Sequence, residues 1–600
     1  MAPYRVWAPL AERVTVSVAG DEVTMIRDAN IEGWWKSEGR QARAGEPYQF
    51  HVDETRDLPD PRSGWQPEGV HGPSRFVDHQ AFHWTDGEFQ ARPLSSALIY
   101  ELHVGTFTAE GTFEAIIPRL DHLKRLGVTH VDMMPVADFP GEFGWGYDGV
   151  CLFAPRHRYG GPDGLKTLVD ACHARGLAVI LDVVYNHLGP SGNYLSKFGP
   201  YFTDRHHTPW GDALNFDGPY SDEVRRYFCD NALMWLRDYH LDGLRLDAVH
   251  AIVDTSATTF LEQLATEVDV LKAHLGRHLV LIAESDANDP RIVRPWEIGG
   301  FGIDAQWSDD FHHALHSVIT GEQNGYYSDF GSMCDLATAF ETSYVYTGRR
   351  SKFRMKRHGR PPIGLTGHHF LGYVQNHDQL GNRAKGDRLC HLTTLERAKV
   401  AAALVLTAPF IPMLFQGEEF GSTSPFQYFA DFAAEPELAR AVSEGRRKEF
   451  SQFGWKPEDV PEPGSPETFD RSKIHWDEVE REPHASLLEW HRKLIELRRR
   501  MPQLTDGRLD LVVTEASDEE QWLFVERGLV SIVANLADVP RRIPLREGRP
   551  DGVLLASVGQ GIEIGQDFVT LPPHSVAILG PITEDTAQAL FRTSVEVLSI

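Results

Sequence analysis

Short apolar runs alternate with amphipathic segments from about residue 97 to residue 504. Such runs, bounded by turn signals, are typical of strands that are buried on both faces of a sheet. The segments between several of them read as helices; in PRLDHLKRLG, Pro118 suits the first turn and Gly127 the C-terminal cap. The strand-like runs are ALIYELHVG, VTHVDMMPV, LAVILDVVYNH, GLRLD, HLVLIAES, IDAQW, LGYVQNHD and IPMLFQGEE. Eight strands in β-then-α order predict a (β/α)8 TIM barrel, and a doubly wound open sheet is the alternative.

Both flanks of this region have the pattern of β structure. Residues 1–95 contain short alternating segments such as RVTVSVAG, separated by Gly, Pro and Asp. Four aromatic residues there could be core or a sugar-stacking face, and core is favoured: Trp7, Trp34, Trp35 and Tyr48. Residues 505–600 predict a small antiparallel β domain to about Gly580, followed by a short tail for which a helix is one alternative. We therefore divide the chain into 1–95, 96–504 and 505–600.

Two segments complete the predicted barrel region. Residues 427–482 are polar and contain PEPGSPE, which indicates an insertion in the last βα unit. The segment SLLEWHRKLIELRRR carries Leu487, Trp490 and Leu494 at helical spacing and predicts a closing helix. The charge run Arg498–Arg500 lies at the C-terminus of that helix, where the helix dipole is sufficient to explain it.

The stretch 242–250, DGLRLDAVH, carries an arginine, a carboxylate and an imidazole within six residues. Leu244 and Leu246 alternate with Arg245 and Asp247, which is the periodicity of a strand. A helical segment follows, and we expect Thr255 or Ser256 as its N-cap. Asp247 is thus predicted where a strand ends and a loop begins. A surface salt bridge near a turn is the alternative for this stretch taken alone.

Composition narrows the range of partners. The formal net charge of −27 argues against general nucleic-acid binding and against adhesion to anionic membranes. The five cysteines are scattered and contain no CxxC pair, which favours free thiols in a reducing compartment. The sequence has neither a signal-peptide pattern nor an apolar stretch long enough to span a bilayer. We expect a soluble, cytoplasmic protein; nothing in the sequence determines its oligomeric state.

Four polar clusters are predicted at the C-terminal ends of four strands. They are Asp182, Asn186 and His187; Arg245, Asp247 and His250; Glu284; and Asn376, His377 and Asp378. Barrel closure brings such strand ends together at one face. Several carboxylates that converge there raise one another's pKa and destabilise the fold, which favours a functional role for them.

Glycosyl transfer uses this combination of groups. One carboxylate attacks or stabilises the anomeric carbon, and a second one, kept protonated, donates its proton to the leaving oxygen. Glu284 follows the apolar run LVLIA and suits the acid, whereas Arg245 would keep Asp247 ionised as the nucleophile. A divalent-metal site is a rival hypothesis, although the clusters lack HxH and ExxH spacing and Arg245 would repel a cation. A non-catalytic glucan-binding protein is a rival from another class, which the retained carboxylates disfavour.

The phrases DVVYNH, GLRLDAVH, LIAES and VQNHD resemble, in this order, the four short conserved regions of the α-amylase superfamily, glycoside hydrolase family 13. The resemblance covers about residues 97–504. It implies Asp247 as nucleophile, Glu284 as general acid/base and Asp378 as the carboxylate that grips sugar hydroxyls. It further implies subsite roles for Arg245, His187 and His377, a ring-stacking role for Tyr147, and a structural role for Asp182. The N-terminal part resembles the early-set, immunoglobulin-like, carbohydrate-binding β-sandwich that precedes such barrels.

Longer phrases are similar to one group within the superfamily, the trehalohydrolases. These phrases are AESDANDPR, YVQNHDQLGNR and GWGYDGVCLFAPRHRYGGPDGLK. The similarity implies hydrolysis of the α-1,4 bond next to the terminal trehalose of maltooligosyltrehalose, with branching enzyme as the alternative and a debranching enzyme third. It also implies no metal and no cofactor, although Asn186 could be a remnant calcium ligand. The further substrate-binding residues that we expect are His250, Asp286, Arg291 and Gln379. Other candidates are Tyr201 and Trp210, for which loop packing is the alternative, and Glu418, Glu419, Phe426, Tyr428 and Phe429.

Overall fold

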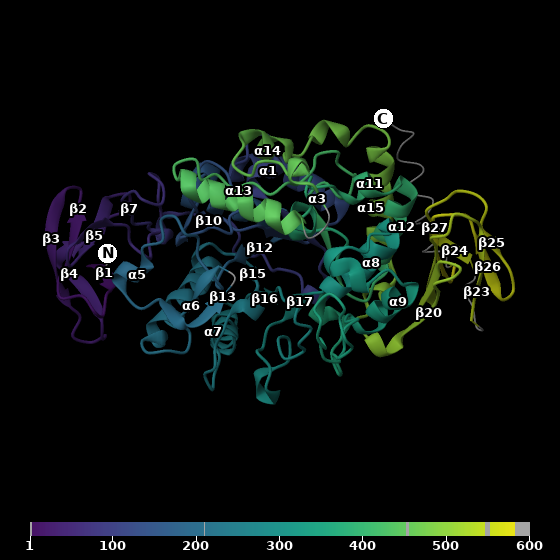
Figure 1. Ribbon diagram of the computed structural model, residues 1–600, viewed down its shortest axis with the longest axis horizontal. Coiled ribbons are helices and arrows are strands. Elements are labelled where there is room, and N and C mark those ends of the chain that lie inside the picture. Colours follow the sequence, from purple (N-terminus) through teal and green to yellow (C-terminus); the bar gives the residue numbers. More distant parts are fainter. Residues whose placement is uncertain (1–2, 209, 452–454, 547–551, 583–600) are drawn as a thin grey trace.

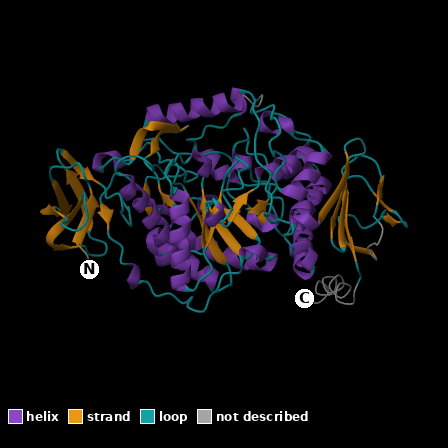
Figure 2. Ribbon diagram, turned by 90° about the horizontal axis from the view of Figure 1, so that it is seen from below, coloured by secondary structure: helices purple, strands orange, loops and turns teal. Residues whose placement is uncertain are grey.

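The computed structural model describes residues 3–208, 210–451, 455–546 and 552–582. Figure 1 shows three parts in a row, with an antiparallel sheet at the N-terminal end, a barrel in the middle and antiparallel sheets at the C-terminal end. Seen along the perpendicular direction, the barrel strands lie at the centre with helices packed around them (Figure 2). Among the described helices, none combines the length and the apolarity that crossing a bilayer requires.

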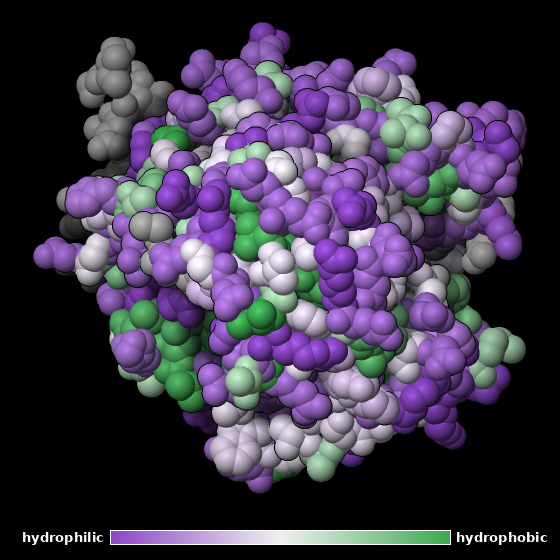
Figure 3. Space-filling model, turned by 90° about the vertical axis from the view of Figure 1, so that its left-hand side faces the viewer, coloured by the Kyte–Doolittle hydropathy of each residue, from purple (hydrophilic) through white to green (hydrophobic). Residues whose placement is uncertain are grey.

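The N-terminal part is a seven-stranded antiparallel sheet in the order β1-β4-β3-β2-β5-β6, with β7 paired to β5. The alternation in the sequence places Val14, Val16 and Val18 in its core, and Val16 lies opposite Phe50. Its strands are β1 (Pro3–Trp7), β2 (Val14–Val18), β3 (Asp21–Arg27), β4 (Trp34–Gln41), β5 (Pro47–Val52), β6 (Thr55–Leu58) and β7 (Ser74–Arg75). The end of the molecule that carries this sheet is mostly hydrophilic, with only scattered apolar patches (Figure 3).

The aromatic residues of this sheet are core and docking residues. Trp7, Trp35 and Tyr48 are buried, and Trp34 donates a hydrogen bond of 3.0 Å from Nε1 to Glu223 in α6 (Ser221–Asp238). The favoured interpretation as core is thus confirmed for Trp7, Trp35 and Tyr48. The half-buried Trp34 attaches the sheet to the barrel.

Eight parallel strands close into a barrel in the order β12-β15-β16-β17-β18-β19-β8-β9. Each predicted run contributes one strand, so the predicted fold class is confirmed. The strands are β8 (Ile99–Leu102), β9 (His130–Met133), β12 (Ala178–Val183), β15 (Gly243–Leu246), β16 (Val280–Ala283), β17 (Ala305–Trp307), β18 (Phe370–Gly372) and β19 (Ile411–Phe415). The register pairs Asp182 with Arg245 and Leu246 with Ala283, which places Asp247 and Glu284 at adjacent strand ends.

Helices follow the strands as predicted, but one helix begins later in the sequence than we expected. They include α3 (Leu120–Leu126), α4 (Gly161–His173), α6, α7 (Phe260–Leu275), α8 (Asp309–Thr320), α9 (Met333–Thr342), α12 (Leu395–Thr407) and the closing helix α15 (His484–Arg500). The prediction of Thr255 or Ser256 as the N-cap of α7 was wrong. The N-cap is Thr259, which forms a capping box with Glu262, because the Thr255 and Ser256 hydroxyls bind Asp217 and Arg225 instead.

The polar segment after β19 forms α13 (Pro436–Ser451) and α14 (Pro466–Arg471), which lie across the barrel at the top of Figure 1. Beyond α15, β20, β21, β22, β27 and β24 form a five-stranded sheet and β23, β26 and β25 a smaller one. Their bounds are β20 (Val512–Ser517), β21 (Trp522–Arg527), β22 (Val530–Asn535), β23 (Arg541–Pro544), β24 (Gly552–Ala556), β25 (Glu563–Ile564), β26 (Phe568–Leu571) and β27 (Ser575–Gly580). The tail expected at the C-terminus lies outside the described residues from 583 onward.

Arg498 has a structural role that the helix dipole does not explain. Its guanidinium is buried and donates hydrogen bonds of 2.7–3.0 Å to the carbonyl oxygens of Leu406, Ala408 and Phe410, and burial lowers its pKa to about 9. These bonds fix the end of α12 against the closing helix, whereas Arg500 forms an exposed pair with Glu496.

We expect Arg498→Met to lower the free energy of unfolding by about 3 kcal/mol, because three buried carbonyl groups lose a charged donor. Calorimetric melting of the variant beside Arg500→Met measures this effect. Arg500→Met should leave the melting temperature nearly unchanged, and equal effects of the two variants would contradict the assignment.

Candidate active site

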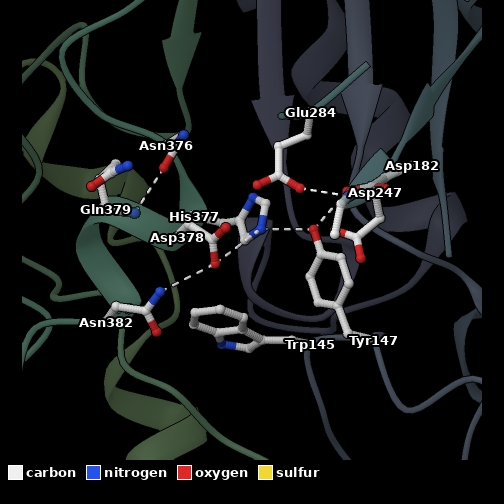
Figure 4. A network of polar contacts seen from close by, with 12 residues as sticks. Trp145, Tyr147, Asp182, Asp247, Glu284, Asn376, His377, Asp378, Gln379 and Asn382 are labelled. Atoms are coloured by element: carbon white, nitrogen blue, oxygen red, sulfur yellow. Dashed lines mark hydrogen bonds and ion pairs between the residues drawn. The ribbon is translucent and has the colours of Figure 1, made fainter. Parts of the chain in front are cut away.

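Several barrel strands end in acidic side chains that point into one group. Asp182 lies in β12, Asp247 follows β15 and Glu284 follows β16, whereas Asp378 lies in the short helix α10 (His377–Gly381) after β18. Figure 4 shows that the side chains of Asp182, Asp247, Glu284 and Asp378 face one another. The structure therefore brings together the carboxylates that the sequence singled out.

Asp247 is held in one orientation by two neighbours. The Arg245 Nη1 lies 2.7 Å from its Oδ1, and the Asn186 Nδ2 donates to its Oδ2 at 2.7 Å and to its carbonyl oxygen at 2.8 Å. The side chain is only 11% exposed. Charge-assisted hydrogen bonds of this kind favour the ionised carboxylate, which is the form that can act as a nucleophile.

Arg245 is fully buried and serves more than one carboxylate. Its Nη1 lies 2.6 Å from Asp182, and its Nη2 lies 3.3 Å from Glu284. Its guanidinium carbon lies 4.2 Å from the ring centre of Trp307, the last residue of β17. Burial alone would lower the pKa of Arg245, but the surrounding carboxylates raise it well above its ordinary value. Arg245 therefore keeps its positive charge, and its contacts fix the position of the guanidinium.

Glu284 has the environment of an acid. Burial raises its pKa well above the ordinary value; Arg245 opposes that rise, and Asp247 and Asp378 add to it. The backbone N–H of Ala248 donates to Oε2 of Glu284 at 2.6 Å. Ala248 has a φ of +40°, a left-handed conformation that is costly for alanine and that turns its N–H toward Glu284. Because Oε2 accepts this bond, the proton belongs on Oε1.

His377 carries a positive charge and lies between Glu101 and Tyr147. Its Nδ1 lies 2.5 Å from Glu101 at the barrel strand β8, and its Nε2 lies 2.7 Å from the Tyr147 hydroxyl, which in turn donates to Asp182 at 2.5 Å. Burial alone would lower the pKa of His377, but Glu101 and Asp378 raise it to about 9. These hydrogen bonds hold the Tyr147 ring nearly parallel to the His377 imidazole, with ring centres 5.1 Å apart.

Trp145 packs against His377, the residue that holds Tyr147 in place. Its ring packs edge-on against His377 at 5.5 Å and stacks on Phe426 at 5.4 Å. Gly381 allows the contact, because a Cβ at this position would lie 1.9 Å from the Trp145 ring.

Asp378 is the most accessible of the site's carboxylates. Its side chain is 35% exposed, and Oδ1 lies 3.3 Å from Asn382 Nδ2 and 3.6 Å from His377 Nε2. A carboxylate with these contacts keeps lone pairs free for sugar hydroxyl groups. The neighbouring Gln379 is half-buried, and its Oε1 accepts hydrogen bonds from the Tyr326 and Tyr327 hydroxyls.

His187 lies near Asp247 and next to Asn186. Its Nδ1 is 2.5 Å from Asn186 Oδ1, and its ring stacks on Trp210 with centres 4.5 Å apart. Burial lowers the pKa of His187, although Asp247 opposes this, so the imidazole is neutral at neutral pH. Trp210 is 52% exposed and extends the aromatic surface outward.

The remaining predicted substrate-binding residues lie toward the surface. Asp286 forms an ion pair of 2.8 Å with Arg354, and His250 is exposed near it. Arg291 pairs with Asp289 at 2.6 Å and is exposed, so the structure does not place it with the catalytic group.

The candidates after β19 are mostly buried. Glu419 is fully buried between the Tyr100 hydroxyl and His122, and burial raises the pKa of Glu418 to about 8. Phe426 and Phe429 are fully buried as well, whereas Tyr428 is only partly buried. Packing in the interior accounts for the positions of Glu419, Phe426 and Phe429.

Sequence reasoning missed two residues of the site, and it missed the contact with Asp247 that Asn186, a member of a predicted cluster, makes. Glu101 is the partner that charges His377. Asp309 lies two residues beyond β17, close to Glu284 and Asp378. The available signal was the same in the last two cases, a carboxylate within or just after an apolar barrel strand. Among the residues that the structure describes, no group of three or more His, Cys, Asp and Glu side chains is arranged to hold a metal ion.

Comparisons with known proteins agree with this geometry. A family model described as the catalytic domain of alpha-amylase matches residues 72–210 and 212–507, and a domain of unknown function, DUF3459, matches residues 507–578. A malto-oligosyltrehalose trehalohydrolase of Rhizobium sp. (strain M-11) is 47% identical over 584 residues, which cover 96% of this chain and 97% of that protein. The trehalohydrolase of Arthrobacter ramosus is 49% identical over 554 residues, covering 91% and 94% of the two chains.

The solved structures extend the similarity to the whole fold. The crystal structure of a putative alpha amylase from Salmonella typhimurium superimposes with a TM-score of 0.88 at 37% identity and covers 96% of this chain and 97% of that chain. A 1,4-alpha-glucan branching enzyme of Pseudoalteromonas atlantica is a more distant relative, 27% identical over 356 residues that cover 52% of this chain and 49% of that protein.

The pair of Glu101 and His377 predicts a pH-dependent contribution to stability. Because the folded-state pKa of about 9 exceeds the ordinary 6.5, this contribution is fully present below about pH 6.5 and is lost as the pH rises through about 9. We expect Glu101→Gln to cost about 3 kcal/mol of unfolding free energy near pH 6 and clearly less above pH 9. Denaturant unfolding across this range tests it, with the surface variant Glu496→Gln as control. A cost that did not depend on pH would contradict a charged His377.

Proposed function

The chain belongs to the alpha-amylase family and, within it, to the malto-oligosyltrehalose trehalohydrolases, and we propose that it hydrolyses the α-1,4 bond next to the terminal trehalose of maltooligosyltrehalose. One observation supports the mechanism most strongly. The carboxyl groups of Asp247 and Glu284 flank the same guanidinium, at 2.7 Å and 3.3 Å, and burial raises the pKa of Glu284 well above its ordinary value. A retaining glycosidase uses one carboxylate as the nucleophile and a second carboxyl group, kept protonated, as the acid.

In the first step, Asp247 acts as the nucleophile. Its carboxylate oxygen forms a bond to the anomeric carbon of the glucose next to the trehalose unit, while the bond from this carbon to the trehalose oxygen breaks. Glu284 donates its proton from Oε1 to that oxygen, and free trehalose leaves. The maltooligosyl chain remains bound covalently to Asp247.

In the second step, Glu284 acts as the base. It is now ionised, and it removes a proton from a water molecule whose oxygen attacks the anomeric carbon. The bond to Asp247 breaks, the maltooligosaccharide leaves with its anomeric configuration retained, and Glu284 is protonated again.

Other residues stabilise the oxocarbenium-like transition state of each step. Tyr147 presents a ring that can stack under the reacting sugar, and we assign the binding of its hydroxyl groups to Asp378 and His187. Both nitrogens of His377 already bind Glu101 and Tyr147, so we assign to His377 the positioning of Tyr147. Arg245 fixes Asp247 and is itself shielded from solvent. Asp182 accepts bonds from Arg245 and Tyr147, so we assign it a structural role.

The choice of trehalose as the product is supported by the relatives of 47–49% identity. The same catalytic groups serve branching enzymes, so the reaction must be tested on both kinds of substrate. Incubation with maltooligosyltrehalose should release free trehalose and a shortened maltooligosaccharide. Incubation with amylose should give no new α-1,6 linkages by NMR. Absence of trehalose from the first mixture would overturn the proposed substrate.

The variant Glu284→Gln tests the role of the acid separately from the role of the nucleophile. We expect kcat/KM on maltooligosyltrehalose to fall about a thousandfold, because the leaving oxygen is no longer protonated. A maltooligosyl fluoride needs little protonation of its leaving group. With this substrate the variant should therefore release a rapid burst of about one fluoride per enzyme, while the absent base slows the second step.

Asp247→Asn provides the matched control. It keeps the shape of the side chain but removes the nucleophile, so it should show no fluoride burst. A burst from Asp247→Asn, or none from Glu284→Gln, would contradict the assigned roles.

A further inference from the structure

A carboxyl group to which the proposed mechanism assigns no role lies beside the acid. Asp309 is the first residue of α8, two residues beyond the end of β17. The register pairs Ala283 of β16 with Gln306 of β17, so Glu284 and Asp309 both emerge at the same face of the barrel from neighbouring strands. Asp309 thus lies at the level of the catalytic groups.

The position of Asp309 is fixed by the scaffold that supports Arg245. The Tyr373 hydroxyl donates a hydrogen bond of 2.5 Å to Oδ1 of Asp309. The Tyr373 ring is fully buried and packs edge-on against Trp307, with centres 5.5 Å apart. Because Trp307 also lies against the Arg245 guanidinium, Tyr373 connects Asp309 with the centre of the site.

The groups around Glu284 and Asp309 show which charges act on the acid. The charged groups that act on Glu284 are Arg245, Asp247, Asp378 and Asp309. The groups that act on Asp309 are Tyr373, Asp286, Asp310 and Asp378. Burial, opposed by the Tyr373 hydrogen bond and supported by the neighbouring carboxylates, raises the pKa of Asp309 to about 7. Asp309 is therefore negatively charged on the alkaline side of neutrality, where an acid catalyst is most prone to lose its proton.

We propose that Asp309, held by Tyr373, is a positioning residue for the general acid and that its negative charge keeps the proton on Glu284. This inference rests on the proposed role of Glu284 as the acid. Arg245 favours the ionised form of Glu284 from one side, and Asp309 opposes it from the neighbouring strand. Ionised Asp309 therefore extends the pH range in which Glu284 can protonate the leaving oxygen.

The test is the pH profile of kcat/KM for Asp309→Asn. The amide has the same shape and can still accept the Tyr373 hydrogen bond, but it carries no charge. We expect the alkaline limb, which reports loss of the Glu284 proton, to move about one unit toward lower pH. On that side of the profile kcat/KM should fall about tenfold. The acidic limb should move much less.

Asp289→Asn is the matched control, because Asp289 follows Glu284 closely in sequence but pairs with the exposed Arg291. Its profile should superimpose on that of the wild type. With a maltooligosyl fluoride, whose leaving group needs little protonation, fluoride release by Asp309→Asn in the first turnover should equal that of the wild type. A structural defect would impair both substrates alike.

Tyr373→Phe gives an independent readout if Asp309→Asn folds poorly. Loss of the hydroxyl donor raises the pKa of Asp309, so Asp309 is less often charged and the alkaline limb should move partway in the same direction. An unchanged alkaline limb in folded Asp309→Asn, or in folded Tyr373→Phe where the first variant does not fold, would overturn the inference. If the wild type released no trehalose, the proposed substrate would fail separately, and the same profiles measured on the α-glucan that it does cleave would still decide the role of Asp309.

Discussion

The Arg245 guanidinium lies among three carboxylates at the mouth of the barrel, 2.6 Å from Asp182, 2.7 Å from Asp247 and 3.3 Å from Glu284. A buried cation is costly unless its donors are paired, and buried carboxylates are costly unless a cation lies near. Each group here therefore depends on the others. Removal of the guanidinium would leave several like charges at close range in a site with little solvent, so the arrangement holds only while Arg245 is in place.

One cation cannot neutralise three carboxylates, and this imbalance produces the catalytic asymmetry. The carboxylate of Asp247 receives one direct bond from Arg245 and one from Asn186. Glu284 receives a longer contact from Arg245, and burial together with the charges of Asp247 and Asp378 raises its pKa. The surroundings of Glu284 therefore favour its protonated form. The second cation, His377, is balanced by Glu101 and positions Tyr147 without adding a strong contact to Glu284. Nucleophile and acid are thus distinguished by their neighbours, although both are carboxyl groups at the ends of adjacent strands.

The barrel and the convergence of polar residues at its strand ends could be predicted because both depend on local patterns. Eight apolar runs specify eight strands, and polar residues at their ends must meet once the barrel closes. The start of α7 at Thr259 could not be predicted, since Asp217 and Arg225 come from distant segments to bind Thr255 and Ser256. The same limit applies to Arg498, whose carbonyl partners lie about ninety residues away. Asp309 and Glu101 could have been singled out in the sequence, because each is a carboxylate within or just after a barrel strand. Their roles could not be predicted, because these roles depend on side chains from neighbouring strands. The preference for trehalose came from resemblance alone, because the spacing of the carboxylates is common to the superfamily.

The covalent role of Asp247 is the central claim, and trapping of the glycosyl-enzyme intermediate tests it most directly. A fluorinated maltooligosyl fluoride that slows the second step should leave one glycosyl group on each enzyme molecule. Mass spectrometry of the proteolysed adduct should locate this group on the peptide that contains Asp247, and Asp247→Asn should remain unlabelled. A label on another carboxylate, or turnover that releases the inverted anomer without an intermediate, would contradict the mechanism.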